Sequence, residues 1–142
     1  MLKINFWDKT TKTMMRFNDN FDSLSVVDGE LKPFLNSLVY NNENWYKRDY
    51  IPLMSTGVKD KNGKEIFQGD ILYIGTYSYE EPINEYKGTV EFDDTIMAFV
   101  LNGEDCNGEK DKYLLSDLIR EYYYVDINII GNSYENSELL ED

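Results

Sequence analysis

The sequence contains no histidine and only one cysteine, Cys106. The absence of histidine excludes the Ser-His-Asp triad, the Cys-His nucleophile pair and His-based zinc sites. A single cysteine forms no intrachain disulfide and builds no thiolate metal site. We interpret Cys106 as an ordinary loop thiol, because only Lys110 and Lys112 lie near it in sequence to favour the thiolate. No cofactor, metal or catalytic residue is therefore predicted.

Long apolar runs are also missing, and alanine occurs once, at Ala98. No stretch reaches the roughly 18 apolar residues that a membrane-spanning helix needs, and the N-terminus lacks the apolar run of a signal peptide. Twelve tyrosines and seven phenylalanines favour strands, whereas the scarcity of alanine disfavours helices. We expect a mainly β protein with little helix, located in the cytoplasm and without membrane contact.

The net charge of −13 is distributed unevenly along the chain. Residues 1–48 carry seven Lys/Arg and six Asp/Glu, whereas residues 49–142 carry seven Lys/Arg and twenty-one Asp/Glu. Because a negative field repels phosphate backbones, we expect no direct binding to nucleic acid. The charge has two interpretations: it solubilises the chain, or it meets a basic patch on another protein.

The N-terminal third predicts short strands joined by turns. Alternation over Leu2–Trp7, a polar turn and a returning strand at Thr13–Phe17 predict a hairpin. A strand at Ser23–Val27 is followed by Asp28-Gly29, a tight-turn signal. Over Glu30–Trp45, helical spacing competes with strand-forming residues, and both alternatives stay open. The helical spacing comes from Leu31, Phe34, Leu35 and Leu38, and the strand-forming residues are Val39 and Tyr40.

Residues 49–142 read as the main domain, with residues 1–48 as a hairpin and connecting segment. Asn62-Gly63 predicts a type I′ hairpin turn, and Gly69 with Asp70 predicts a second turn capped by the aspartate. Several short strands with little helix predict a small barrel or sandwich. The pattern predicts strands at Tyr50–Met54, Ile71–Tyr77, Gly88–Phe92, Ile96–Leu101 and Tyr122–Ile130, a short helix at Leu114–Arg120, and polar loops at Ser78–Tyr86 and Asn102–Lys112.

Two stretches, Asp60–Gly63 and Asp105–Gly108, faintly resemble calcium-binding loops. An EF-hand loop needs an oxygen ligand at its first position and a glutamate at its twelfth. Neither stretch meets this requirement when its glycine is set at the sixth position. We therefore interpret both stretches as turns.

Four segments resemble, in order, those of the YopX family. They are FWDKTTKTM, the signature Gly57–Leu72 (GVKDKNGKEIFQGDIL), GTVEF and NIIGNSYENSELL. The resemblance implies a phage or prophage protein in a bacterial cell, with a small SH3-like β-barrel at residues 49–142, that assembles as a homo-oligomer. The signature residues have a sufficient structural explanation in tight turns and their capping. These residues are Gly57, Asp60, Gly63, Gly69 and Asp70.

The leading functional hypothesis is a non-enzymatic accessory protein that binds a host or phage protein with a basic surface. One version is an acidic mimic that occupies the nucleic-acid groove of a host defence or regulatory protein. The alternatives are a self-assembling structural protein and a carboxylate- or metal-dependent enzyme, which requires acids that converge in a pocket. The candidate partner-binding residues are Glu80, Glu81, Glu85, Asp93, Asp94, Glu104, Asp105, Glu109 and Asp111.

Overall fold

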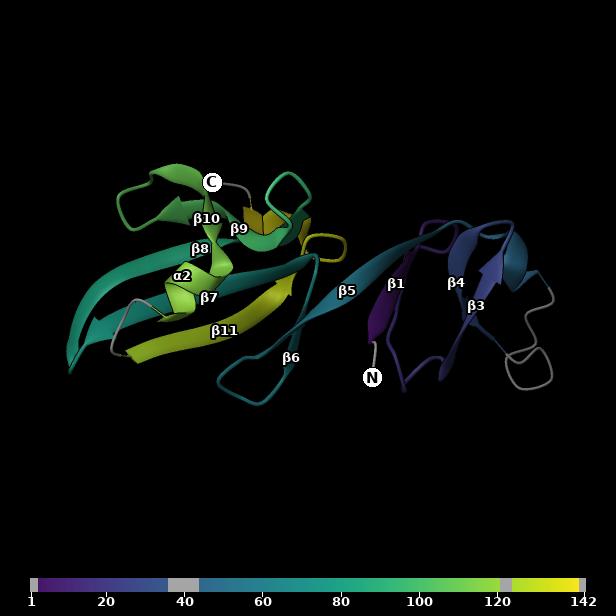
Figure 1. Cartoon of the computed structure of the whole chain (residues 1–142), viewed down its shortest axis with the longest axis horizontal. Coiled ribbons are helices and arrows are strands. Elements are labelled where there is room, and N and C mark those ends of the chain that lie inside the picture. Colours follow the sequence, from purple (N-terminus) through teal and green to yellow (C-terminus); the bar gives the residue numbers. More distant parts are fainter. Residues whose placement is uncertain (1–2, 36–43, 121–123, 141–142) are drawn as a thin grey trace. The chain divides into compact units, whose positions relative to one another are not determined.

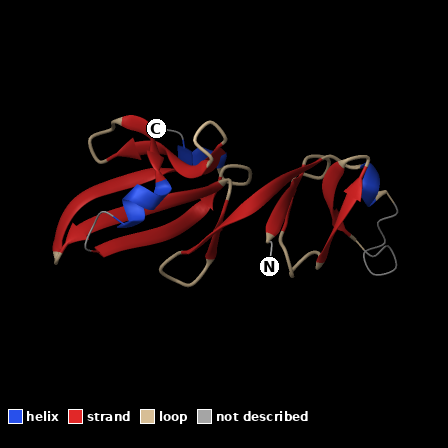
Figure 2. Cartoon of the chain, viewed as in Figure 1, coloured by secondary structure: helices blue, strands red, loops and turns tan. Residues whose placement is uncertain are grey.

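Strands dominate the computed structural model, which describes residues 3–35, 44–120 and 124–140 (Figure 2). The chain divides into two compact units, Met1–Ser55 and Thr56–Asp142. The division predicted from the sequence falls after residue 48, whereas the division between the two compact units falls within the strand β5 (Tyr50–Lys59).

The N-terminal unit is built on the hairpin of β1 (Ile4–Asp8) and β2 (Thr13–Met15). Strand β1 also pairs antiparallel with the first half of β5. The core of this unit is apolar and largely aromatic, and the ring of Phe6 meets those of Phe21 and Tyr50 edge-on at 5.4 and 6.0 Å. The predicted N-terminal β-hairpin is therefore confirmed.

A second hairpin joins β3 (Ser23–Val27) to β4 (Glu30–Phe34) through Asp28-Gly29. Both turn residues have positive φ, 52° and 81°, as a type I′ turn requires. This turn folds residues 30–34 back along β3, so these residues form a strand and not the first turns of a helix. Residues 36–43, with the rest of the predicted helical spacing, lie outside the described residues.

Buried polar groups tie the end of the connecting segment to this unit. Asp8 is fully buried, and its carboxylate accepts from two backbone amides of the following turn and from Arg48 Nη1 at 3.0 Å. The buried Lys32 ammonium donates to the carbonyl oxygens of Tyr46 and Arg48 at 2.7 and 2.9 Å. The short helix η1 (Trp45–Lys47) is thereby held by its carbonyl groups.

The C-terminal unit contains a five-stranded antiparallel sheet with the strand order β10-β9-β8-β7-β11. Helix α2 (Leu115–Arg120) lies across one face of it and buries Leu115 and Leu118 in the main core (Figure 1). Register shifts in β7–β8 and β11–β7 pairing bend the strands, and the sheet curls into a half-barrel. The strands are β7 (Asp70–Ser78), β8 (Glu81–Asp93), β9 (Ala98–Asp105), β10 (Lys110–Leu114) and β11 (Tyr124–Asn132).

The prediction of a mainly β fold with little helix is confirmed, and the predicted small SH3-like barrel takes the form of this curled half-barrel sheet. The predicted helix at Leu114–Arg120 forms, and Val125, Ile127 and Ile129 of β11 face the core as the alternation indicated. Tyr123, which belongs to the same prediction, lies outside the described residues.

The two predicted polar loops, Ser78–Tyr86 and Asn102–Lys112, are wrong, because most of their residues belong to β8, β9 and β10. A sheet with one solvated face places polar residues at alternate positions. In β8, for example, Tyr86 is buried whereas Glu85 is exposed. The acidic side chains were mistaken for a sign of irregular structure, and the turns are much shorter.

The predicted type I′ turn at Asn62-Gly63 is also wrong. Gly63 has a φ of 81°, but Asn62 does not have positive φ. Instead, Gly63 N donates to Asp60 O at 3.0 Å and Asp60 N donates to Lys64 O at 2.7 Å. These bonds define a type I turn closed by a glycine bulge.

The same turn recurs from Asp105 to Glu109, where Gly108 has a φ of 78°. In this turn Gly108 N donates to Asp105 O at 3.0 Å, and Asp105 N donates to Glu109 O at 3.1 Å. The two stretches that resemble calcium loops are thus one kind of hairpin turn, as interpreted.

Candidate functional site

The signature segment holds one edge of the C-terminal sheet. Asp60 is buried, and its Oδ1 accepts from the amides of Asn62 and Lys64 at 2.9 and 2.8 Å. Its Oδ2 faces Ile129 N at 3.4 Å, and Lys61 N donates to Ile127 O at 2.9 Å. The hairpin between β5 and β6 (Glu65–Phe67) therefore satisfies backbone groups on the side of β11 that faces away from β7.

The second turn of the signature is equally structural. Asp70 Oδ2 accepts from Phe67 N at 2.8 Å, which caps the turn as predicted. Gly69 has a φ of 89°, in the region that favours glycine, and its amide donates to Val90 O at 2.8 Å. The formation and capping of turns account for the signature residues, so we expect a functional surface among other residues.

Seven of the nine candidate partner-binding residues lie toward one end of the sheet, which we call the acidic end. It consists of the β7–β8 turn, the start of β8 and the β9–β10 hairpin, and the amide of Cys106 in that hairpin contacts Asn84 Oδ1 of β8 at 3.4 Å. The seven residues are Glu80, Glu81, Glu85, Glu104, Asp105, Glu109 and Asp111.

The other two candidates, Asp93 and Asp94, lie at the opposite end of β8. At a rise of about 3.3 Å per residue, the 13 residues of β8 put Glu81 up to roughly 40 Å from Asp93 along the strand. Glu104 pairs with Lys87, so it is level with a residue only about 20 Å from Asp93 along β8. The nine residues thus form two surfaces. Asp93 Oδ1 accepts from the amide and hydroxyl of Thr95 at 3.0 and 2.6 Å, and these bonds lower the pKa of Asp93.

The pKa values of two tyrosines near the acidic end are raised. A hydrogen bond to Glu85, together with burial, raises the pKa of Tyr73 to about 12. Burial first, and then the negative charge of three nearby carboxylates, raises the pKa of Tyr113. Those carboxylates belong to Asp105, Glu109 and Asp111. The negative charge at this end of the sheet thus adds to burial in holding the Tyr113 phenol in its neutral form.

Large apolar side chains are exposed among these carboxylates. Tyr79 in the β7–β8 turn is 76% exposed, and Ile83 near the start of β8 is 50% exposed. Apolar contacts surrounded by a charged rim are typical of protein–protein interfaces. The sequence alone did not indicate these two exposed residues, because the whole segment was predicted to be a polar loop.

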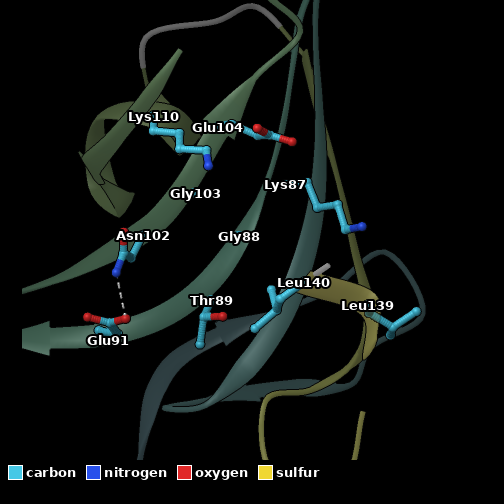
Figure 3. Close-up of a pocket in the computed structure, with 10 residues that line it drawn as sticks. All are labelled: Lys87, Gly88, Thr89, Glu91, Asn102, Gly103, Glu104, Lys110, Leu139 and Leu140. Atoms are coloured by element: carbon cyan, nitrogen blue, oxygen red, sulfur yellow. Dashed lines mark hydrogen bonds between the residues drawn. The ribbon is translucent and has the colours of Figure 1, made fainter. Parts of the chain in front are cut away.

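A pocket of about 300 Å³ lies next to the acidic end and shares Glu104 with it (Figure 3). Charges of opposite sign alternate across three paired strands at this pocket. Glu104 of β9 pairs with Lys87 of β8 on one side and with Lys110 of β10 on the other. Figure 3 shows Lys110 and Glu104 on one side of a pair of glycines and Leu140 on the other. The pocket is lined by Lys87, Gly88, Thr89, Glu91, Asn102, Gly103, Glu104, Lys110, Leu139 and Leu140, the last two from η2 (Ser137–Leu140).

The pair of glycines in this pocket has a packing reason. Gly88 and Gly103 face each other in register, and a Cβ on Gly103 would lie 2.0 Å from Lys87 O. The backbones of β8 and β9 thus approach more closely than any side chain allows. The side chains that line the pocket carry two ammonium and two carboxylate groups. Asn102 Nδ2 donates to one of the two carboxylates, that of Glu91, at 2.9 Å. The pocket is therefore close to neutral and interrupts the acidic surface.

Within residues 3–35, 44–120 and 124–140, no group of three or more histidine, cysteine or acidic residues is arranged to hold a metal ion. In the same part of the chain, no helix has the length and apolar character needed to cross a membrane.

The family model for YopX protein matches residues 6–141, nearly the whole chain. The chain belongs to the YopX family. This finding confirms the resemblance noted in the sequence, and the matched range includes both units. No curated protein matches the chain.

Two solved structures are similar to the chain over nearly its whole length. The YopX protein from Bacillus subtilis is 21% identical, with 98% of each chain covered and a TM-score of 0.54. Protein EF1440 from Enterococcus faecalis is 24% identical, with 99% of each chain covered and a TM-score of 0.49. At these identities the B. subtilis YopX structure shows a common architecture and nothing about a common partner.

Proposed function

We propose that this YopX-family chain is a non-enzymatic phage or prophage accessory protein that works in the bacterial cytoplasm. It binds a host or phage protein through the acidic end. The observation that supports this proposal is the exposure of Tyr79 and Ile83 within a rim of carboxylates drawn from two hairpins. The apolar residues supply buried area, and the carboxylates select a basic surface.

The finer form of the proposal is nucleic-acid mimicry. A groove that normally binds a phosphate backbone is lined by Lys and Arg, and it attracts a surface with the charge of the acidic end. The interrupting lysines at the pocket, Lys87 and Lys110, restrict this mimicry to the end of the sheet and exclude its middle.

The test is affinity capture from host lysate with the full tagged chain at low and high salt. The variant Glu80→Lys/Glu81→Lys reverses two charges at the acidic end, and Asp19→Lys/Asp22→Lys makes the same change in net charge on exposed residues of the N-terminal unit. We expect salt-sensitive capture of a basic protein, lost in the first variant and kept in the control. Equal loss in both variants, or no captured protein, would contradict the proposal.

Self-assembly is the second candidate, and the homo-oligomer remains a prediction. The two edges of the five-stranded sheet do not favour open-ended strand pairing. The β10 edge carries Lys110, Asp111 and Lys112, and charged edges resist pairing, while the outer side of β11 is engaged by Asp60 and Lys61. Light scattering on the full chain tests this candidate, and a strict monomer would exclude it.

A further inference from the structure

The turn between β8 and β9 exposes two large apolar residues at its tip. Met97 is 73% exposed and Ile96 is 56% exposed. Met97 also has a φ of 54°, in the left-handed region that glycine and asparagine adopt at lower cost. Neither stability nor solubility favours methionine at such a position, and strained residues that persist in a fold gather at functional sites.

Hydrogen bonds and an aromatic contact support the conformation of the tip. Asp93 caps the turn by accepting from the amide and hydroxyl of Thr95, and Asp93 pairs with Ala98 in the register. At the base of the hairpin the rings of Phe92 and Phe99 meet edge-on, with centroids 5.3 Å apart. A preorganised tip loses little conformational entropy when it docks, so its apolar side chains contribute more of their burial to affinity.

We propose that Ile96 and Met97 form an anchor that inserts into an apolar pocket on a partner protein, and that basic residues rim this pocket. The basic rim follows from charge complementarity, because two carboxylates, those of Asp93 and Asp94, directly precede the anchor in the same turn. The same two carboxylates disfavour insertion into an anionic lipid surface. The inference rests on the proposed protein-binding function, but it assigns a separate surface at the other end of β8.

A hairpin tip at the acidic end shows the same combination of an exposed apolar side chain and a left-handed backbone. The most exposed apolar residue of the acidic end, Tyr79, also lies at a hairpin tip with a left-handed φ of 58°. Two hairpins of one sheet thus present a large apolar side chain in the same unfavourable conformation. Since the length of β8 separates the tips, they contact two different sites, on one large partner or on two partners.

The test places a diazirine-bearing amino acid at position 97 of the full chain and irradiates it in host lysate. The matched control carries the same group at position 26, since Val26 in β3 is an apolar residue with 71% exposure. We expect a protein adduct at position 97 that the control does not form. The labelled peptide of that protein should contain apolar residues flanked by Lys or Arg.

Competition identifies the side chain responsible. Excess unlabelled wild-type chain should abolish the adduct, whereas excess Met97→Gly chain should not. Met97→Gly relieves the left-handed strain, so its unfolding midpoint should stay equal or rise, and its failure to compete cannot be due to misfolding. Labelling of lipid, of a second copy of the chain, of the same proteins at both positions, or of nothing overturns the inference.

The two proposals fail separately. Glu80→Lys/Glu81→Lys leaves the β8–β9 tip unchanged and should keep the adduct at position 97. If that variant loses salt-sensitive capture while position 97 labels nothing, the acidic end binds a partner and the anchor is rejected. If the adduct forms and capture is unaffected by the charge reversal, the acidic end is rejected instead.

Discussion

Replacing Asp60 by alanine should destabilise the C-terminal unit far more than the same change in a matching turn. Asp60 is buried, and its carboxylate accepts from the amides of Asn62 and Lys64 and faces that of Ile129. The truncation leaves these amides without their acceptor. At about 1–1.5 kcal/mol for each of the three amides, the expected loss in the free energy of unfolding is about 3–4.5 kcal/mol.

Asp105 provides the control within the same chain. Its Oδ1 accepts from Asn107 and Glu109 at 2.9 and 3.0 Å, in the same type I turn with a glycine bulge. These bonds are solvent-exposed, so water replaces the lost acceptor. Asp105→Ala should therefore cost about 1 kcal/mol. The difference between the two variants isolates burial and the contact with β11, because the local turn chemistry is common to both.

The two units can be followed separately in one urea titration of the full chain. Both tryptophans, Trp7 and Trp45, belong to the N-terminal unit, so their fluorescence reports that unit alone. Amide hydrogen exchange follows the C-terminal unit residue by residue. Asp60→Ala should accelerate exchange along β11 and leave the tryptophan transition in place. Equal destabilisation by Asp60→Ala and Asp105→Ala would refute the structural role assigned to Asp60.

Three further outcomes are expected. Gly103→Ala should cost at least about 1–3 kcal/mol in a urea titration, because its Cβ would meet Lys87 O at 2.0 Å. Met97→Gly should instead raise the stability by about 0.5–1 kcal/mol, since the relieved left-handed strain exceeds the entropic cost of glycine. Burial, and then the charge of Asp8, raises the pKa of Tyr50 to about 12. The raised pKa stabilises the fold below pH 10, and this contribution is lost as the pH rises from 10 to 12. Tyr50→Phe should reduce that alkaline loss when tryptophan fluorescence follows unfolding against pH.

The sequence predicts the fold well where one local rule decides the structure. Asp28-Gly29 forms the expected type I′ turn because nothing competes with it. At Asn62-Gly63 the same dipeptide logic fails, because Asp60 two residues earlier accepts from the turn amides and selects a type I turn with a bulge. The decisive residue lies outside the pair on which the prediction rests.

The candidate site was less predictable because sheet geometry is not local. Acidic residues in β8 and β9 suggested loops, although they occupy the solvated face of strands whose alternate residues are buried. The sequence did not show that Asp93 and Glu81 lie at opposite ends of one strand, because the extent of β8 depends on its pairing with neighbouring strands. Glu85 and Lys87 lie on either side of the buried Tyr86, and this alternation of polar and apolar residues was a strand signal that the net charge concealed.

The residues that identify the family are therefore distinct from the residues that we propose to face a partner. Asp60, Gly69 and Asp70 act on the backbone of neighbouring strands, so changing them alters the scaffold wherever the binding surface lies. Tyr79 and Met97 contribute little to the core, and substitution at these tips leaves the sheet pairing intact. Hairpin tips on a fixed sheet can change their partner without changing the fold. For this reason the YopX match specifies the architecture, whereas our proposal makes the identity of the partner depend on a few exposed residues at the two ends of β8.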